Sequence, residues 1–199
     1  LAIKNNDWEE SDPKEFWEWF NDQKDKDRQI VRIVKYLKAW CDHKRNKMPD
    51  GLAMTILAED NLVFNENRDD KTLRDTLENM QDSLKQRFEC IVPTTPNDDV
   101  FEDYTETRKN NFLDNLDAFI EDANKAIDEE ENQLKASKLW KKHLGDRFPE
   151  GADENTDKKE ADLRERAGQV LSGTAYTQRN GRINDNDEGV GNKEHRNYG

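Results

Sequence analysis

Apolar side chains recur at helical spacing along most of the first 149 residues. The clearest stripe runs through residues 25–45, where large apolar residues stand three or four positions apart. This spacing predicts one long helix that buries a single face. The stripe consists of Ile30, Ile33, Val34, Leu37, Trp40 and Cys41.

Helix-start residues precede this stripe. Ser11-Asp12-Pro13 predicts the start of a first helix, because a serine or aspartate caps free N–H groups and proline suits the first helical position. Four aromatic residues follow at once, and we interpret them as core packing. They are Phe16, Trp17, Trp19 and Phe20.

Three further apolar stripes predict helices in residues 52–61, in residues 73–88 and from Thr105 to Ile127. The last continues or restarts from Leu134 to Leu144, with Gly145 as a C-cap. No stretch shows the clean alternation of a β-strand, and only residues 90–92 are strand-like. The sequence therefore predicts an all-α bundle of about five helices.

The composition changes after residue 149. Residues 150–199 are rich in glycine, asparagine and charged residues and contain few large apolar ones. Such a segment buries too little surface to offset the entropy lost on ordering. We therefore expect a helical domain over residues 1–149 and a disordered polar tail over residues 150–199, with a transient helix at Leu163 to Leu171.

The charge balance narrows the classes of function. The chain carries 45 acidic against 32 basic side chains, a net charge of −13, which argues against strong nucleic-acid binding. No apolar run approaches the roughly 20 residues that span a bilayer, and no signal-peptide pattern is present. Cys41 lies in an apolar stripe and is interpreted as a buried small hydrophobe. We expect a cytoplasmic protein without membrane contact.

The chain does not contain a complete active site. Its three histidines are scattered, without metal-ligand or triad spacing, so we assign no catalytic and no metal-binding residues. Lys35 and Lys38 are more informative, since residues three apart lie on the same side of a helix. Two lysines beside an apolar face suit a phosphate group, and an ordinary solvated helix face is the alternative interpretation.

Four segments in order resemble one known family. They are Trp8-Glu9-Glu10-Ser11-Asp12-Pro13 followed by Trp19-Phe20, Arg32-Ile33-Val34-Lys35-Tyr36-Leu37-Lys38-Ala39-Trp40, Met48-Pro49-Asp50-Gly51-Leu52 with the residues to Leu57, and Trp140 through Gly145-Asp146-Arg147-Phe148-Pro149. Together they resemble the C-terminal helical half of the bacterial cGAS/DncV-like nucleotidyltransferases, also called SMODS or CD-NTase enzymes. The resemblance covers about residues 1–149.

The resemblance implies a nucleotidyltransferase of two lobes that joins ATP or GTP into cyclic di- or oligonucleotide second messengers for CBASS anti-phage defence. Mg²⁺ ions would be bound by carboxylates of the other lobe, next to a Gly-Ser motif. Neither feature is found in this sequence, so we expect the chain to be inactive alone. Because it opens on Leu1 rather than methionine, Leu1 is not expected to be a natural start.

The resemblance also assigns roles to individual residues. Lys35 matches a helix lysine that contacts the nucleotide triphosphate, and Lys38 is the alternative. Ser11 matches a serine near the nucleotide, with helix capping as its other interpretation. Asp50 stands where many relatives have a phosphate-contacting serine, and its carboxylate would repel phosphate. The polar tail implies an E1/E2-like partner that conjugates Gly199, whereas an ordinary chain terminus is the alternative.

A non-catalytic helical interaction module with a partner-binding tail is the competing hypothesis. On that hypothesis the apolar stripes are core and the acidic surface provides solubility. An exposed apolar face left by a missing lobe would favour the synthase, and a fully polar surface would favour the module.

Overall fold

The computed structural model describes residues 13–23, 28–45, 48–179, 181–184 and 189–191. Over these residues the chain has seven α-helices and three strands of two residues each, which confirms the all-α class predicted from the sequence. The described residues form two compact units. Unit 1 lies within residues 1–130 and 135–150, and unit 2 lies within residues 131–134 and 151–199.

Unit 1 contains the helices that the apolar stripes predict. Their starts and stops follow local chemistry: the side chain of Thr105 caps α5, and Gly145 ends α6 with a positive φ of 82°. A π-helix follows α5 without a break. The elements are α1 (Pro13–Asp22), α2 (Gln29–Lys44), α3 (Gly51–Asp60), α4 (Asp69–Gln86), α5 (Glu106–Asn124), the π-helix (Lys125–Glu129) and α6 (Gln133–Leu144).

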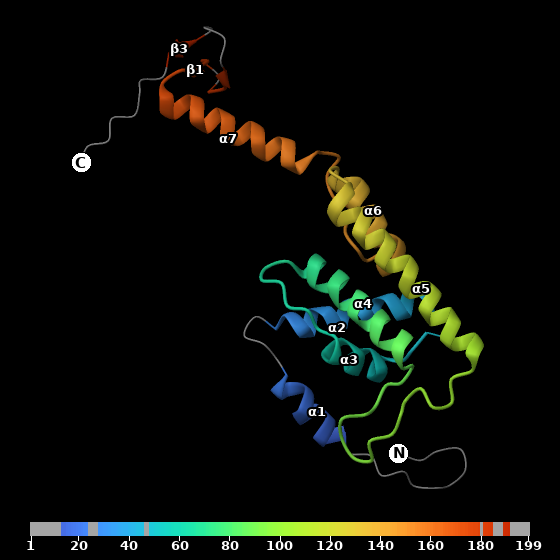
Figure 1. The fold of residues 1–199 in the computed structure, drawn as a ribbon. Helices are drawn as coiled ribbons and strands as arrows, with labels where there is room; N and C mark the ends of the chain where they lie inside the picture. The colour runs from blue at the N-terminus through green and yellow to red at the C-terminus, as the bar shows by residue number, and fades with distance from the viewer. Residues whose placement is uncertain (1–12, 24–27, 46–47, 180, 185–188, 192–199) are drawn as a thin grey trace. The chain divides into compact units, whose positions relative to one another are not determined.

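The core of unit 1 forms where these helices meet. Helix α2 packs against α3 and α4, and α4 packs against α5 (Figure 1). The predicted stripe of α2 is buried, and the ring of Trp40 lies 5.9 Å from Phe112 and 5.2 Å from Phe119 between centroids. The ring of Trp140 on α6 packs edge-on against Phe119, with 5.9 Å between centroids. Aromatic side chains from α2, α5 and α6 therefore share one core.

Helix α1 contributes less to this core than the sequence predicts. Phe16, Trp19 and Phe20 are partly buried and pack against the core, but no residue of α1 is fully buried. The prediction of core packing is wrong for Trp17, whose side chain is 62% exposed. Trp17 falls on the outer side of the helix because it is one position from Phe16, a rotation of about 100°.

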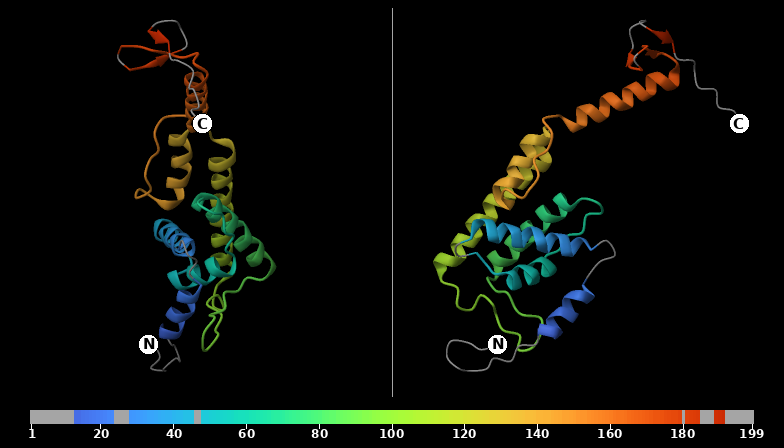
Figure 2. Two further views of the ribbon diagram at one scale, coloured as in Figure 1. Left: turned by 90° about the vertical axis from the view of Figure 1, so that its left-hand side faces the viewer. Right: turned by 180° about the vertical axis from the view of Figure 1, so that it is seen from behind.

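Unit 2 is built on helix α7 (Thr156–Ser172), which includes the predicted Leu163–Leu171 segment. Three short strands follow α7 (Figure 2): β1 (Tyr176–Thr177), β2 (Ile183–Asn184) and β3 (Val190–Gly191). They pair antiparallel in the order β2-β1-β3. Among the described residues of this unit only Ala175 is buried. The low apolar content of the tail thus gives secondary structure without a core of its own.

Candidate functional site

The two lysines singled out in the sequence lie on the exposed side of α2. Neither Lys35 nor Lys38 forms a hydrogen bond or ion pair with any residue that the structure describes. Arg32, one turn earlier, is instead held by Asp69: its Nε donates to Oδ2 at 2.6 Å and its Nη2 to Oδ1 at 2.9 Å. Helix α2 therefore presents two ammonium groups that are available to an anion.

The side chain of Lys38 lies across the start of α3. A methyl group added to Gly51 would come within 3.1 Å of Lys38 Cε and 3.6 Å of its Nζ. The preceding residue, Asp50, caps α3, and its Oδ1 accepts a hydrogen bond from the N–H of Ala53 at 2.9 Å. A carboxylate already occupies the positive end of this helix, so a phosphate placed there would meet a like charge.

Arg108 is a third cation beside this segment, and sequence reasoning missed it. Its guanidinium lies 3.6 Å above the centre of the Tyr104 ring, and its Nη2 donates to the carbonyl of Met48 at 3.2 Å. Burial raises the pKa of Tyr104, and Asp50 adds to the rise while Arg108 opposes it. No local pattern marks Arg108, because it approaches residue 48 only through the packing of α5.

Two predicted residues fall outside the described structure. Ser11 and Gly199 both lie there, so their roles stay predictions. Within the described ranges no group of three or more histidine, cysteine or acidic side chains is placed to hold a metal ion. None of the described helices has the length and apolar character needed to cross a membrane.

The cysteines behave as buried small hydrophobes, as predicted for Cys41. Both thiols are free and buried. Burial, aided by nearby carboxylates, raises the pKa of Cys41 and of Cys90 to about 12. Because the thiolate is the reactive form, neither cysteine is suited to nucleophilic chemistry.

One histidine does have a partner, which sequence spacing did not reveal. His143 of α6 is fully buried, and its Nε2 lies 2.6 Å from Oδ2 of Asp122 on α5. The Nζ of Lys142 also lies 2.6 Å from the same oxygen. The imidazole stacks on Phe119 at 4.5 Å between centroids, and no residue in the described ranges bonds its Nδ1. This cluster ties α5 to α6.

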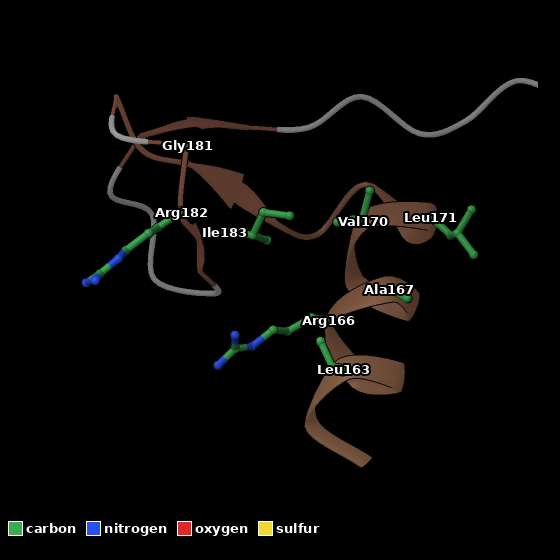
Figure 3. A pocket seen from close by; sticks show the side chains of 8 residues that line it. All are labelled: Leu163, Arg166, Ala167, Val170, Leu171, Gly181, Arg182 and Ile183. Carbon is green, nitrogen blue, oxygen red and sulfur yellow. The ribbon is translucent and has the colours of Figure 1, made fainter. Parts of the chain in front are cut away.

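Unit 2 carries an open groove between α7 and the β2 region (Figure 3). Leu163, Val170 and Leu171 line it from α7, with Ile183 opposite. Arg166 and Arg182 extend from the two sides of the groove. It is an apolar surface with two basic groups and no acidic side chain among its lining residues.

Comparison with known proteins identifies the class of fold. No family model matches the sequence. Solved structures do match, and they show that the chain has a cGAS/DncV-like fold.

Two of the matching structures are of the Vibrio cholerae di-nucleotide cyclase DncV. One is a point mutant in complex with ATP, GTP and 5MTHFGLU2, with a TM-score of 0.61, 18% identity, and coverage of 72% of this chain and 38% of DncV. The other is the cyclic AMP-GMP synthase with a linear intermediate, pppA(3′,5′)pG, with a TM-score of 0.59, 18% identity, and coverage of 74% and 40%. The present chain thus spans about two fifths of the DncV chain.

Proposed function

We propose that this chain is the C-terminal helical lobe of a cyclic di- or oligonucleotide synthase that uses ATP and GTP. The proposal is supported by the cGAS/DncV-like fold and by the share of DncV that the chain spans. The sequence lacks the Gly-Ser motif and carboxylate pair expected of the other lobe. The chain alone is therefore expected to make no product, and its partner lobe would bind the Mg²⁺ ions.

The observation that carries the binding role is the availability of the α2 lysines. Lys35 would contact the triphosphate, since it is exposed and forms no hydrogen bond or ion pair within the described residues. Lysine suits this role because its compact ammonium follows a mobile anion on a flexible stem. Lys38 would add a second positive charge, with Asp50 limiting how closely phosphate approaches the start of α3.

Reconstitution with the missing lobe tests this proposal. The coding sequence upstream of Leu1 would first be read for an in-frame Gly-Ser motif followed by a carboxylate pair. The encoded lobe would then be mixed with the full chain, ATP, GTP and Mg²⁺, and cyclic products would be quantified by chromatography. Neither component alone should give product.

Substitution of one lysine assigns the site. Lys35→Ala should lower kcat/KM at least about tenfold, because a charge-assisted hydrogen bond contributes roughly 1.5–3 kcal/mol. Lys85→Ala is the matched control on α4, where the lysine is similarly exposed and lies 3.6 Å from Asp117. Unchanged synthesis in Lys35→Ala would remove Lys35 from the site.

The anti-phage role and the conjugation of Gly199 belong to the same proposal and rest on the family resemblance. An E1/E2-like partner would form a bond to the terminal carboxylate, so a conjugate should appear by intact-mass measurement after co-expression. Deleting Gly199 should abolish that conjugate without changing synthesis by the reconstituted pair. Conjugation at any other position would contradict this part of the proposal.

A partner-binding module is the second candidate function, and the groove in unit 2 favours it. Leu163 and Leu171 are 57% and 62% exposed beside the two arginines. The exposed apolar residues of unit 1 would instead favour the synthase, because a missing lobe would leave such residues uncovered, although single exposed apolar residues are common. They are Trp17, Leu52, Phe64 and Ile91. A reconstituted pair without nucleotide response, together with a defined protein partner, would establish the module instead.

A further inference from the structure

A cavity of about 180 Å³ opens in unit 1 beside Tyr36 of α2. Residues two apart on a helix lie on nearly opposite sides, so this cavity is separate from the Lys38 surface. Its walls come from α2, α4, α6 and the segment after α6. They are formed by three aromatic residues, two leucines and two carboxylates: Tyr36, Trp140, Phe148, Leu73, Leu144, Asp69 and Asp70.

Three aromatic rings line this cavity without filling it. Within the described residues no stacking contact joins Tyr36, Trp140 and Phe148 to one another, so the space between the rings is open. Trp140 is 8% exposed and is fixed edge-on against Phe119 at 77°. Leu73 and Leu144 also line the cavity and are buried. The walls are thus preformed by the core packing.

Both carboxylates at the cavity are ionised at neutral pH. Hydrogen bonds from Arg32 lower the pKa of Asp69, with further bonds from Gln29 and Tyr36. Burial alone would raise the pKa of Asp70, but the bonds from Arg68 at 2.9 and 2.7 Å give a net lowering. Neither arginine lines the cavity, and no other basic side chain does.

These carboxylates have little hydrogen-bonding capacity left for a ligand. Oδ1 of Asp69 accepts from Arg32 and Gln29, and Oδ2 accepts from Arg32 and Tyr36. Arg68 bonds both oxygens of Asp70. A ligand that depends on donating N–H groups would compete with these bonds, whereas a cation without N–H groups would leave them intact.

We propose that this cavity binds an alkylated ammonium cation of the trimethylammonium type. Aromatic faces attract such a cation through their negative ring faces, and no hydrogen bond is needed. The size agrees, because a cavity of about 150 Å³ takes a benzene-sized molecule and a trimethylammonium group is of similar bulk. The leucines would contact its methyl groups, and the two carboxylates are the only charged side chains among the residues that line the cavity. This inference is independent of the proposed nucleotide function.

Calorimetric titration of the full chain with choline tests the proposal. The comparison ligand is dimethylbutanol, in which carbon replaces the charged nitrogen at the same shape. Choline should bind about twofold to thirtyfold more tightly than dimethylbutanol, the range expected from a cation over aromatic faces. Equal affinity for the two ligands, or no heat with choline at millimolar concentration, would overturn the proposal.

Phe148→Leu separates a cation site from a merely apolar slot. Leucine keeps apolar bulk but removes one ring face, so choline should bind about twofold to tenfold more weakly while dimethylbutanol is unaffected. Phe64→Leu is the matched control, at a ring that is 52% exposed and does not line the cavity. Tyr36→Leu provides a second test should Phe148→Leu fail to fold. Unchanged choline affinity in the folded cavity variant would refute the site.

Discussion

Protonation of His143 should weaken the fold below neutral pH. Burial lowers the pKa of His143 from its ordinary value of 6.5, and the charges of Lys44 and Lys142 act in the same direction while Asp122 opposes them. The neutral ring donates from Nε2 to Asp122. A second proton would have to be placed on Nδ1, which is buried and has no partner among the described residues.

The sign and size of the effect follow from linkage. Because the folded pKa lies below the unfolded one, the unfolded chain binds more protons as pH falls through 6.5. The stabilising contribution of neutral His143 is fully present above pH 6.5. It is lost progressively as the pH falls from 6.5 to the pKa of the folded state. The loss is at most about 1.4 kcal/mol per pH unit, the slope for one proton.

Urea unfolding at pH 7.5, 6.5 and 5.5 measures this loss. His143→Phe keeps a ring on Phe119 but removes the titrating group. This substitution should lower the free energy of unfolding by about 1–2 kcal/mol at pH 7.5, because Asp122 loses one hydrogen-bond donor. Between pH 6.5 and 5.5 the free energy of unfolding should fall by up to about 1.4 kcal/mol more in the parent chain than in this variant.

Two comparisons make the test decisive. His43→Phe is the matched control, because it replaces an exposed histidine and leaves the bond between His143 and Asp122 in place. Glu59 and Asp60 have raised pKa values, mainly from burial, so their contributions oppose that of His143 and should be the same in all three proteins. If the free energy of unfolding changes with pH equally in the parent and in His143→Phe, the reasoning is refuted.

Three further predictions concern local structure. Asp50→Ala should lower the free energy of unfolding by about 1 kcal/mol in urea titrations, because α3 loses its N-cap; no change would show that the cap is dispensable. Gly145→Ala should lower the free energy of unfolding by about 1–2 kcal/mol, because φ is 82° and the new methyl group would lie 2.9 Å from His43 Nδ1. A smaller shift in the urea midpoint would mean that the helix end adapts. Cys41 and Cys90 should resist a thiol reagent at pH 8 until the chain unfolds, and rapid labelling of the native chain would contradict their burial.

Apolar periodicity was enough to predict the helices of unit 1. The α2 stripe, the start of α5 at Thr105 and the end of α6 at Gly145 each depend on residues close in sequence. Spacing of three and four selects a helix face, a threonine side chain caps free N–H groups, and glycine accepts a positive φ. The aromatic cluster of α1 was less predictable, because the exposure of Trp17 depends on what packs against that helix.

The candidate site was predictable only in part. Lys35 and Lys38 share an exposed helix face, and their spacing in the sequence was sufficient to indicate this. The position of Lys38 over Gly51 and of Arg108 against Met48 required the packing of α2 and α5 around the start of α3. Contacts between residues 13 and 60 positions apart leave no periodic signal in the sequence.

Local sequence therefore determined which segments are helical and which face of each is apolar, because capping and periodicity act within a few residues. Tertiary structure alone decided the partners of the polar groups: Arg32 with Asp69, and His143 with Asp122. It also placed three aromatic rings and two carboxylates around one cavity. These arrangements depend on the relative placement of whole helices, which only the packing of the core sets.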